Sequence, residues 1–249
     1  MHPITIKKRN KLFNLSSSIL SSRNAIATAI AIIFHVVGLV GILVFKSDLI
    51  IQSTPINLLL SFGLLIWTQP EKNNWFYGFL ILTAIVGFGV EVIGVNTGYL
   101  FGDYSYGKVL GFKWQQVPLM IGINWFITIY CCGIAMHTLL TKAIQKVAVT
   151  TKEPSKTLKV ISLVTDSATL AVAFDWLMEP VAVQLGFWKW LGDGSIPLLN
   201  YICWYFISAL LLLVFHAAPF SKKNNFAVNL LLIQLMFFLL LRTFLNIPS

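Results

Sequence analysis

Three carboxylic acids that lie in otherwise apolar stretches are the residues best suited to chemistry. Glu91 lies in one apolar run, and Asp175 and Glu179 lie four residues apart in another. Residues at i and i+4 of a helix face the same side, so Asp175 and Glu179 are expected to be neighbours. Ionisable groups in apolar surroundings are costly and are functional hypotheses by default. Where two carboxyl groups share a poorly hydrated site, one can keep its proton and act as a general acid while the other acts as a base.

Three further side chains are expected near the level of the acids. Trp125 and Trp204 each lie two turns into an apolar run, and an indole face can stabilise a carbocation. Packing is the more common role of a tryptophan on a helix. Asn124 is a polar group at the same depth that could hold a water molecule. Together these residues suggest a site for cationic chemistry on an apolar substrate.

The local sequence around the acids predicts how their helices are built. Pro180 follows Glu179 directly, and a residue before proline is disfavoured in the α region, so this helix is expected to end at Glu179. Gly87, Gly89 and Gly94 flank the first acid and would let another helix or a flat ligand approach closely.

The elements that must position these residues are membrane helices. The chain has 249 residues, of which 57% are apolar and 11% charged, whereas a soluble domain is about 25% charged. A helix needs roughly 20 apolar residues to cross a bilayer, and seven such runs occur. They span 25–45, 49–67, 75–95, 118–140, 158–179, 197–217 and 227–245. We therefore predict an all-α polytopic membrane protein with about seven transmembrane helices, in a single domain (25–246) after a basic cytoplasmic tail (1–24).

The basic residues predict the orientation of these helices. Of the 18 Lys and Arg residues, 13 fall on the side of the N-terminus, which leaves five on the other side. Because basic residues concentrate in cytoplasmic loops, the N-terminus is expected in the cytoplasm and the C-terminus outside, in a bacterial inner membrane. The net charge of +9 is thereby explained, and no nucleic acid partner is expected.

An internal repeat relates the third and fourth runs to the fifth and sixth. Glu91 and Glu179 match at a separation of 88 residues. Further matches, 79 residues apart, pair Pro118 with Pro197, Trp125 with Trp204 and His137 with His216. Both units begin on the same side of the membrane, so the repeat is parallel, and it places the two glutamates at equivalent depth.

Other seven-helix functions lack their residues in this chain. A retinal protein needs a lysine in its last helix for the Schiff base, and the last run holds Arg242 but no lysine. A membrane polyprenyl transferase needs two aspartate-rich metal clusters, and only the pair Asp175/Glu179 approximates one. The histidines in the apolar runs are isolated on separate helices, so we expect no metal site. The loops contain no glycine-rich phosphate motif. The three cysteines lie within apolar runs and are expected to be buried, and the role of Asp166 stays open.

Four segments carry a family resemblance. They are GYLFGDYSYG (98–107), VPLMIGINW (117–125), DWLMEP (175–180) and GFWKW (186–190). With them the chain resembles the membrane-type carotenoid biosynthesis family, which includes the acyclic carotenoid 1,2-hydratases acting on γ-carotene, lycopene or bisanhydrobacterioruberin. The resemblance covers residues 75–217. It implies an apolar carotenoid substrate taken from the bilayer, no cofactor, and association with other carotenoid enzymes.

The implied reaction is the addition of water across the C1=C2 double bond of an acyclic carotenoid end. An acid protonates C2, a tertiary cation forms at C1, and water captures it. The expected catalytic set is Glu91, Asp175 and Glu179, and the expected substrate-binding residues are Trp125, Trp204, Asn124, Tyr104 and Asp103. Most other aromatic residues of the outer loops are expected to anchor the protein at the membrane interface.

Two alternatives stay open. A carotene cyclase begins with the same protonation but excludes water, although this chain lacks the PxE-type motif of small lycopene cyclases. A non-catalytic carotenoid-binding protein would use the aromatic groove and tolerate loss of the three acids.

Overall fold

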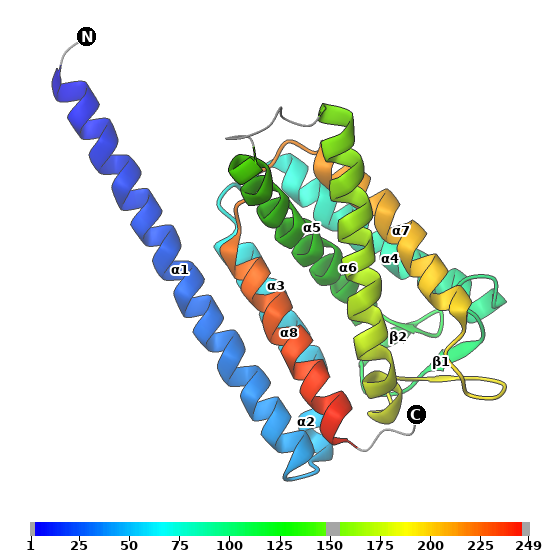
Figure 1. The fold of residues 1–249 in the computed structure, drawn as a ribbon. Helices are drawn as coiled ribbons and strands as arrows, with labels where there is room; N and C mark the ends of the chain where they lie inside the picture. The colour runs from blue at the N-terminus through cyan, green and yellow to red at the C-terminus, as the bar shows by residue number, and fades with distance from the viewer. Residues whose placement is uncertain (1–2, 148–154, 246–249) are drawn as a thin grey trace.

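A computed structural model describes residues 3–147 and 155–245 of the chain (Figure 1). Its helices are α1 (Pro3–Leu43), α2 (Asp48–Gln52), α3 (Thr54–Thr68), α4 (Asn74–Thr97), α5 (Met120–Val147), α6 (Lys156–Gln184), α7 (Leu198–Ala217) and α8 (Asn225–Phe244). Its strands are β1 (Tyr104–Tyr106), β2 (Lys113–Trp114), β3 (Val117–Pro118) and β4 (Trp188–Trp190).

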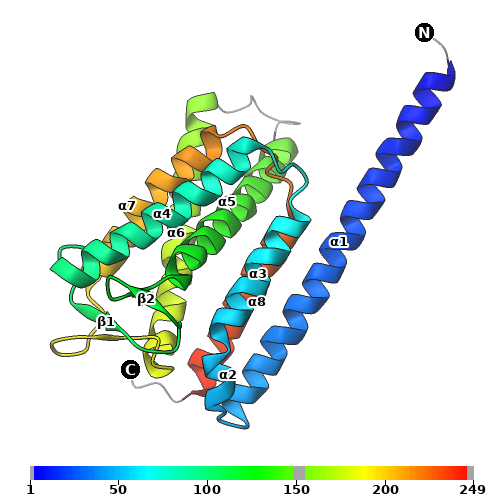
Figure 2. The same cartoon turned by 180° about the vertical axis from the view of Figure 1, so that it is seen from behind.

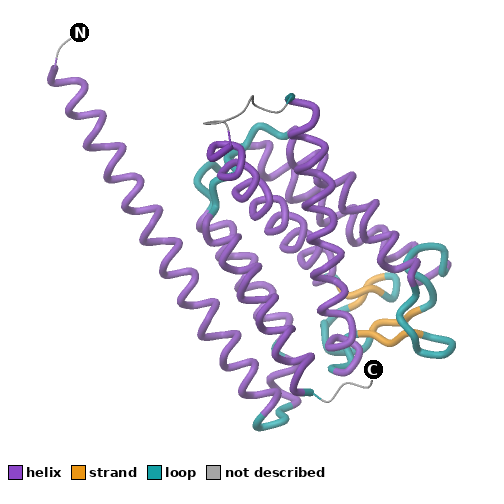
Figure 3. Tube along the Cα trace, in the orientation of Figure 1, coloured by secondary structure: helices purple, strands orange, loops and turns teal. Residues whose placement is uncertain are grey.

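The long helices run alternately up and down in one bundle, and α1 lies along its side (Figures 1 and 2). The most extensive helix contacts join α6 with α7, α4 with α5, and α1 with α8. All four short strands gather at one end of the bundle, in the loops between α4 and α5 and between α6 and α7 (Figure 3). This end therefore carries the non-helical residues that could form a site.

Six helices in the described part of the chain are long and apolar enough to cross a membrane, which confirms most of the predicted spans. The second predicted run, 49–67, is divided between α2 and α3. Ser53 and Thr54 turn their hydroxyls back onto the carbonyls of the preceding turn, and Pro55 opens the new helix. With 15 residues, α3 is about 22 Å long, short of the roughly 30 Å hydrocarbon core. A seventh crossing therefore stays a prediction.

The predicted end of a helix at Glu179 is wrong, because α6 continues through Pro180 to Gln184. Proline lacks the N–H that would bond the carbonyl of Trp176, four residues earlier. Arg242 of α8 supplies the missing donor, since its Nη1 donates to that carbonyl at 2.9 Å. The guanidinium also lies 4.1 Å from the centre of the Trp176 ring. A contact from another helix thus overrides a local breaker.

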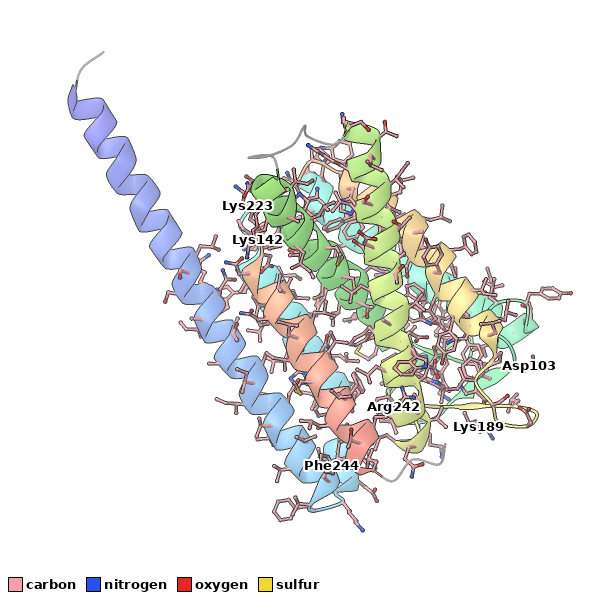
Figure 4. All side chains as sticks on the ribbon, in the orientation of Figure 1. Asp103, Lys142, Lys189, Lys223, Arg242 and Phe244 are labelled. Atoms are coloured by element: carbon pink, nitrogen blue, oxygen red, sulfur yellow. The ribbon has the colours of Figure 1, made fainter. Side chains whose placement is uncertain are left out.

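The ends of the bundle differ in their residues. Helix α1 begins at the end opposite to that at which α8 finishes (Figure 1). Lys142 and Lys223 lie at the end where α1 begins, whereas Asp103, Lys189 and Arg242 lie toward the strand-bearing end (Figure 4). The site described below lies at the strand-bearing end, and the assignment of that end to the outside stays a prediction.

Candidate active site

The three predicted acids meet in one buried chamber. Glu91 comes from α4, and Asp175 and Glu179 come from α6. All three side chains are buried, and they line a chamber of about 30 Å³. The predicted residues Tyr104, Asn124, Trp125 and Trp204 line the same chamber, together with Phe101, Tyr106, Ile121, Met178, Trp188, Trp190 and Asn200. Since a cavity needs only about 10–15 Å³ of such space to hold a water molecule, the chamber has room for at least one.

Glu91 accepts three hydrogen bonds from aromatic side chains. The hydroxyls of Tyr104 and Tyr106 donate to its Oε2 at 2.5 and 2.7 Å, and Trp125 Nε1 donates to its Oε1 at 3.0 Å. Burial, and then the charge of Glu91, raises the pKa of both tyrosines, so they stay protonated as donors. Bonds from several donors favour the charged form of a carboxylate.

Glu179 is held in the same way by the second unit. The indole nitrogens of Trp188 and Trp190 both donate to its Oε2 at 3.0 Å. Its Oε1 accepts no hydrogen bond from a residue that the structure describes. One oxygen of this carboxylate is therefore available to a ligand or to water.

The donors are supplied by two strands that pair across the site. Strand β1 pairs antiparallel with β4, so that Tyr104 lies opposite Trp190 and Tyr106 opposite Trp188. Side chains alternate along a strand, so these four aromatic residues share one face and are buried. Each glutamate is thus bound by the strand that follows its own helix.

Asp175 has the least hydrogen bonding of the three acids. Its Oδ2 accepts from Asn200 Nδ2 at 2.8 Å. Its Oδ1 is buried and has no partner within the described ranges. A buried oxygen without a partner is rare in native structures and calls for an explanation such as catalysis or a bound water.

Two of the three glycines near Glu91 make room for its donors. A Cβ on Gly87 would lie 2.3 Å from Cγ of Trp125, and a Cβ on Gly94 would lie 2.8 Å from the hydroxyl of Tyr104. A Cβ on Gly89 would meet open space. The close approach predicted for these glycines is therefore made by aromatic side chains of the protein itself.

Trp125 and Trp204 stack face to face in the chamber wall. Their ring centroids are 4.0 Å apart and their planes differ by 5°. Each indole covers one face of the other, and the Trp125 indole is also held by the hydrogen bond from its Nε1 to Glu91. The pair thus forms a rigid aromatic wall beside the acids.

A larger apolar cavity of about 370 Å³ adjoins the chamber. The two spaces share four lining residues, Ile121, Asn124, Met178 and Trp188. Most of the residues that line the cavity are apolar, and α1, α3, α6 and α8 supply more than half of the lining. The three acids line only the chamber, so an apolar chain in this cavity would lie next to the chamber that holds them.

The cavity reaches the outer face of the bundle. Phe34 and Val37 of α1 and Ile56 of α3 all line it, and all three are exposed. These residues belong to the apolar outer surface of the bundle, so the cavity opens toward the space that lipid would occupy.

The predicted substrate-binding residue Asp103 and several other residues of the sequence analysis lie away from the chamber. Asp103 is exposed and contributes its carbonyl to a hydrogen bond from Leu191 N. Asp166 is also exposed. His137 and His216 stack 6.3 Å apart, outside the chamber lining. Across the described ranges, no group of three possible metal-binding side chains occurs. The three cysteines are buried, as predicted.

The sequence analysis missed four chamber residues that donate hydrogen bonds to the acids. They are Tyr106, Trp188, Trp190 and Asn200. The first three belong to the outer-loop aromatics that were expected at the interface, and their burial shows that this expectation was wrong for them. The alternation in YSY and WKW was the available signal, because it is the period of a strand with one buried face.

Comparisons with known proteins identify a family and a relative. The model of the "Carotenoid biosynthesis protein" family matches residues 54–248. The chain is also 25% identical over 200 residues to a bisanhydrobacterioruberin hydratase of Haloarcula japonica. That alignment covers 75% of this chain and 63% of the relative, so the chain spans less than two thirds of the relative's length. No solved structure matches the chain.

The family match extends over most of the chain and includes every residue of the chamber. It also includes α3 to α8 and the strands between them, which together contribute all the acids and their donors. The chain belongs to the carotenoid biosynthesis protein family.

Proposed function

We propose that this protein adds water across the C1=C2 double bond of an acyclic carotenoid end, giving a tertiary alcohol. The observation that carries this proposal is the unpartnered, buried Oδ1 of Asp175, which lies in a water-sized chamber joined to an apolar cavity. The similarity to a hydratase of the same family supports it.

Asp175 is the proton donor in this proposal. Glu91 has three donors and Glu179 has two, which suits both of them to the charged state. Asp175 has one donor, and its bare Oδ1 is the position for a proton. The π electrons of the double bond take that proton at C2, which leaves a tertiary cation at C1.

Glu179 is the base. Its Oε1 accepts no hydrogen bond from the described residues and can accept a proton from the water whose oxygen bonds to C1. The charges of both glutamates and the stacked indoles of Trp125 and Trp204 stabilise the cation. Asn124, at the junction of chamber and cavity, orients the water. Transfer of the proton from Glu179 back to Asp175, one helical turn away, closes the cycle.

The substrate enters from the bilayer through the opening beside Phe34, Val37 and Ile56. We place the protein in a bacterial inner membrane with the N-terminus in the cytoplasm, supported by the 13 basic residues on that side. The chamber then lies in the outer half of the membrane, and the polyene extends into lipid.

We also infer that α4–α5 and α6–α7 are duplicated units. Two pairs of residues matched at 79 positions, Trp125 with Trp204 and His137 with His216, are in ring contact with each other. Each unit adds a strand with two inward aromatic residues that bind its own glutamate. This common plan supports a duplication.

The test is the pigment profile of bacterial hosts that make lycopene or γ-carotene, with and without this protein. We expect a new, more polar pigment, heavier by the mass of one water. A product of unchanged mass and altered spectrum would instead indicate a cyclase. Unchanged pigments in both hosts, with the protein shown to be folded in the membrane, would contradict hydration of these substrates and favour a binding protein.

A further inference from the structure

The 370 Å³ cavity contains polar side chains that the proposed reaction does not use. His35 of α1 and Gln234 of α8 line it, and each is more than nine-tenths buried. Gln234 makes no hydrogen bond to any residue in the described part of the chain. Asn57 of α3 also lines the cavity, and its buried Oδ1 has no partner there either. A buried polar group without a partner is costly, so these groups imply a ligand.

The hydrogen bond of His35 determines what its ring offers to a ligand. Its Nδ1 lies 2.8 Å from the carbonyl oxygen of Ala31 and must donate to it. In a neutral imidazole, the other nitrogen then carries the lone pair and accepts. The ring is held edge-on against Phe237, three residues from Gln234 on α8. The cavity therefore offers an acceptor from α1 and an amide, which both donates and accepts, from α8.

We propose that this cavity binds an isoprenoid chain that bears a hydroxyl group, recognised by His35 and Gln234. A hydroxyl can donate to His35 Nε2 and accept from the Gln234 amide at the same time. A carbonyl or an ether has no donor for His35. Among the described residues, no Lys, Arg, Asp or Glu lines the cavity, which disfavours a charged head group. Its volume lies in the usual range for small-molecule sites, roughly 300–1,000 Å³.

This inference rests on the proposed function only for the isoprenoid nature of the ligand. If the enzyme hydrates carotenoid ends, a hydroxylated chain is also the class of its product. A half-modified carotenoid, or a hydroxylated precursor, would then be retained by the cavity in preference to a pure hydrocarbon. The test below measures binding without turnover, so its failure is distinct from failure of the reaction.

The experiment measures how well unlabelled compounds displace tritiated farnesol from the purified full-length protein in lipid nanodiscs. Bound farnesol is measured by scintillation proximity, and the signal from empty nanodiscs is subtracted. The competitors are unlabelled farnesol, its methyl ether and the hydrocarbon farnesene, compared at equal mole fraction in the lipid. We expect the alcohol to compete at about one tenth of the concentration that the ether and the hydrocarbon need. This factor corresponds to about 1.4 kcal/mol, the contribution of one hydrogen bond to a group that is otherwise unpaired. Equal competition, or no specific binding of farnesol, would overturn the proposal.

Variants assign the preference to the two residues. Gln234→Leu and His35→Phe, alone and combined, should abolish the preference for the alcohol and leave competition by farnesene intact. The matched control is Asn229→Leu, since Asn229 of α8 donates to Thr28 of α1 at 2.9 Å and does not line the cavity. Because Gln234 is unpaired, Gln234→Leu should melt at or above the wild-type temperature, which verifies folding. A preference that survives the double substitution would overturn the assignment.

Discussion

Replacing Asp175 by asparagine separates catalysis from stability. The carboxamide has nearly the shape of the carboxyl group, and its oxygen can still accept the bond from Asn200 Nδ2. The fold therefore loses no hydrogen bond, and we expect the free energy of unfolding to change by less than about 1 kcal/mol. The variant has no acidic proton to give to C2.

The expected loss of activity follows from the role of the acid. A positioned general acid contributes about 10²–10⁴-fold, which corresponds to about 2.7–5.4 kcal/mol of transition-state stabilisation. The assay is the rate of hydrated pigment formation from lycopene in membranes that contain equal amounts of folded protein. Asp166→Asn is the matched control, because Asp166 is exposed on the same helix. If Asp175→Asn kept more than a tenth of the activity, Asp175 would not be the acid.

The corresponding change at Glu91 should behave differently. Glu91 uses both oxygens to accept three hydrogen bonds, and in Glu91→Gln one of those oxygens becomes an NH₂ group. At least one buried donor then faces another donor, which costs about 1–3 kcal/mol of stability. We expect a lower melting temperature for Glu91→Gln, whereas Asp175→Asn melts like the wild type. Equal melting temperatures for the two variants would refute the roles assigned from their hydrogen bonds.

Two further substitutions test the surroundings of the site. Gly87→Ala places a Cβ 2.3 Å from Cγ of Trp125 and should destabilise the protein by about 1–3 kcal/mol, as measured by thermal melting. Gly89→Ala is the control, because its Cβ faces open space and should not lower the melting temperature. Burial lowers the pKa of half-buried Lys222 to about 8 from 10.5. Between pH 8 and pH 10.5 the unfolded chain therefore binds more protons than the folded protein, so stability should rise with pH over this range. After allowance for solvent screening, we expect the free energy of unfolding to rise by up to about 1 kcal/mol over this pH range. Melting temperatures measured across the range should show the rise for the wild type and not for Lys222→Met.

The acids could be predicted because their signal is local. Glu91, Asp175 and Glu179 stand out in apolar runs, and the spacing of Asp175 and Glu179 places them on one helix face whatever the rest of the chain does. The depth of Trp125 and Trp204 followed from counting turns from the helix ends. All five were predicted near one level, and all five line the same chamber.

Two donors to the acids, Tyr104 and Trp125, were predicted near the site, but the strand pairing that brings the other aromatic donors there depends on contacts between distant segments. Strands β1 and β4 are three residues each and lie 84 positions apart, and their aromatic composition is also typical of membrane-interface anchors. The path of α6 through Pro180 likewise depends on Arg242, which is 66 residues from the carbonyl that it binds. Local propensity alone predicted a helix end there.

The proposed duplication explains why only one unit carries the acid that gives up its proton. At the separation of 88 that relates the two glutamates, the counterpart of Asp175 is Gly87. In the first unit this position has no side chain, and the space beside it is occupied by Trp125, which donates a hydrogen bond to Glu91. In the second unit it carries a carboxyl group with one bare oxygen. Without that carboxyl group, the chamber would hold only the two glutamates, both of which accept hydrogen bonds from aromatic donors. The asymmetry at this one position therefore gives the site both an acid and a base.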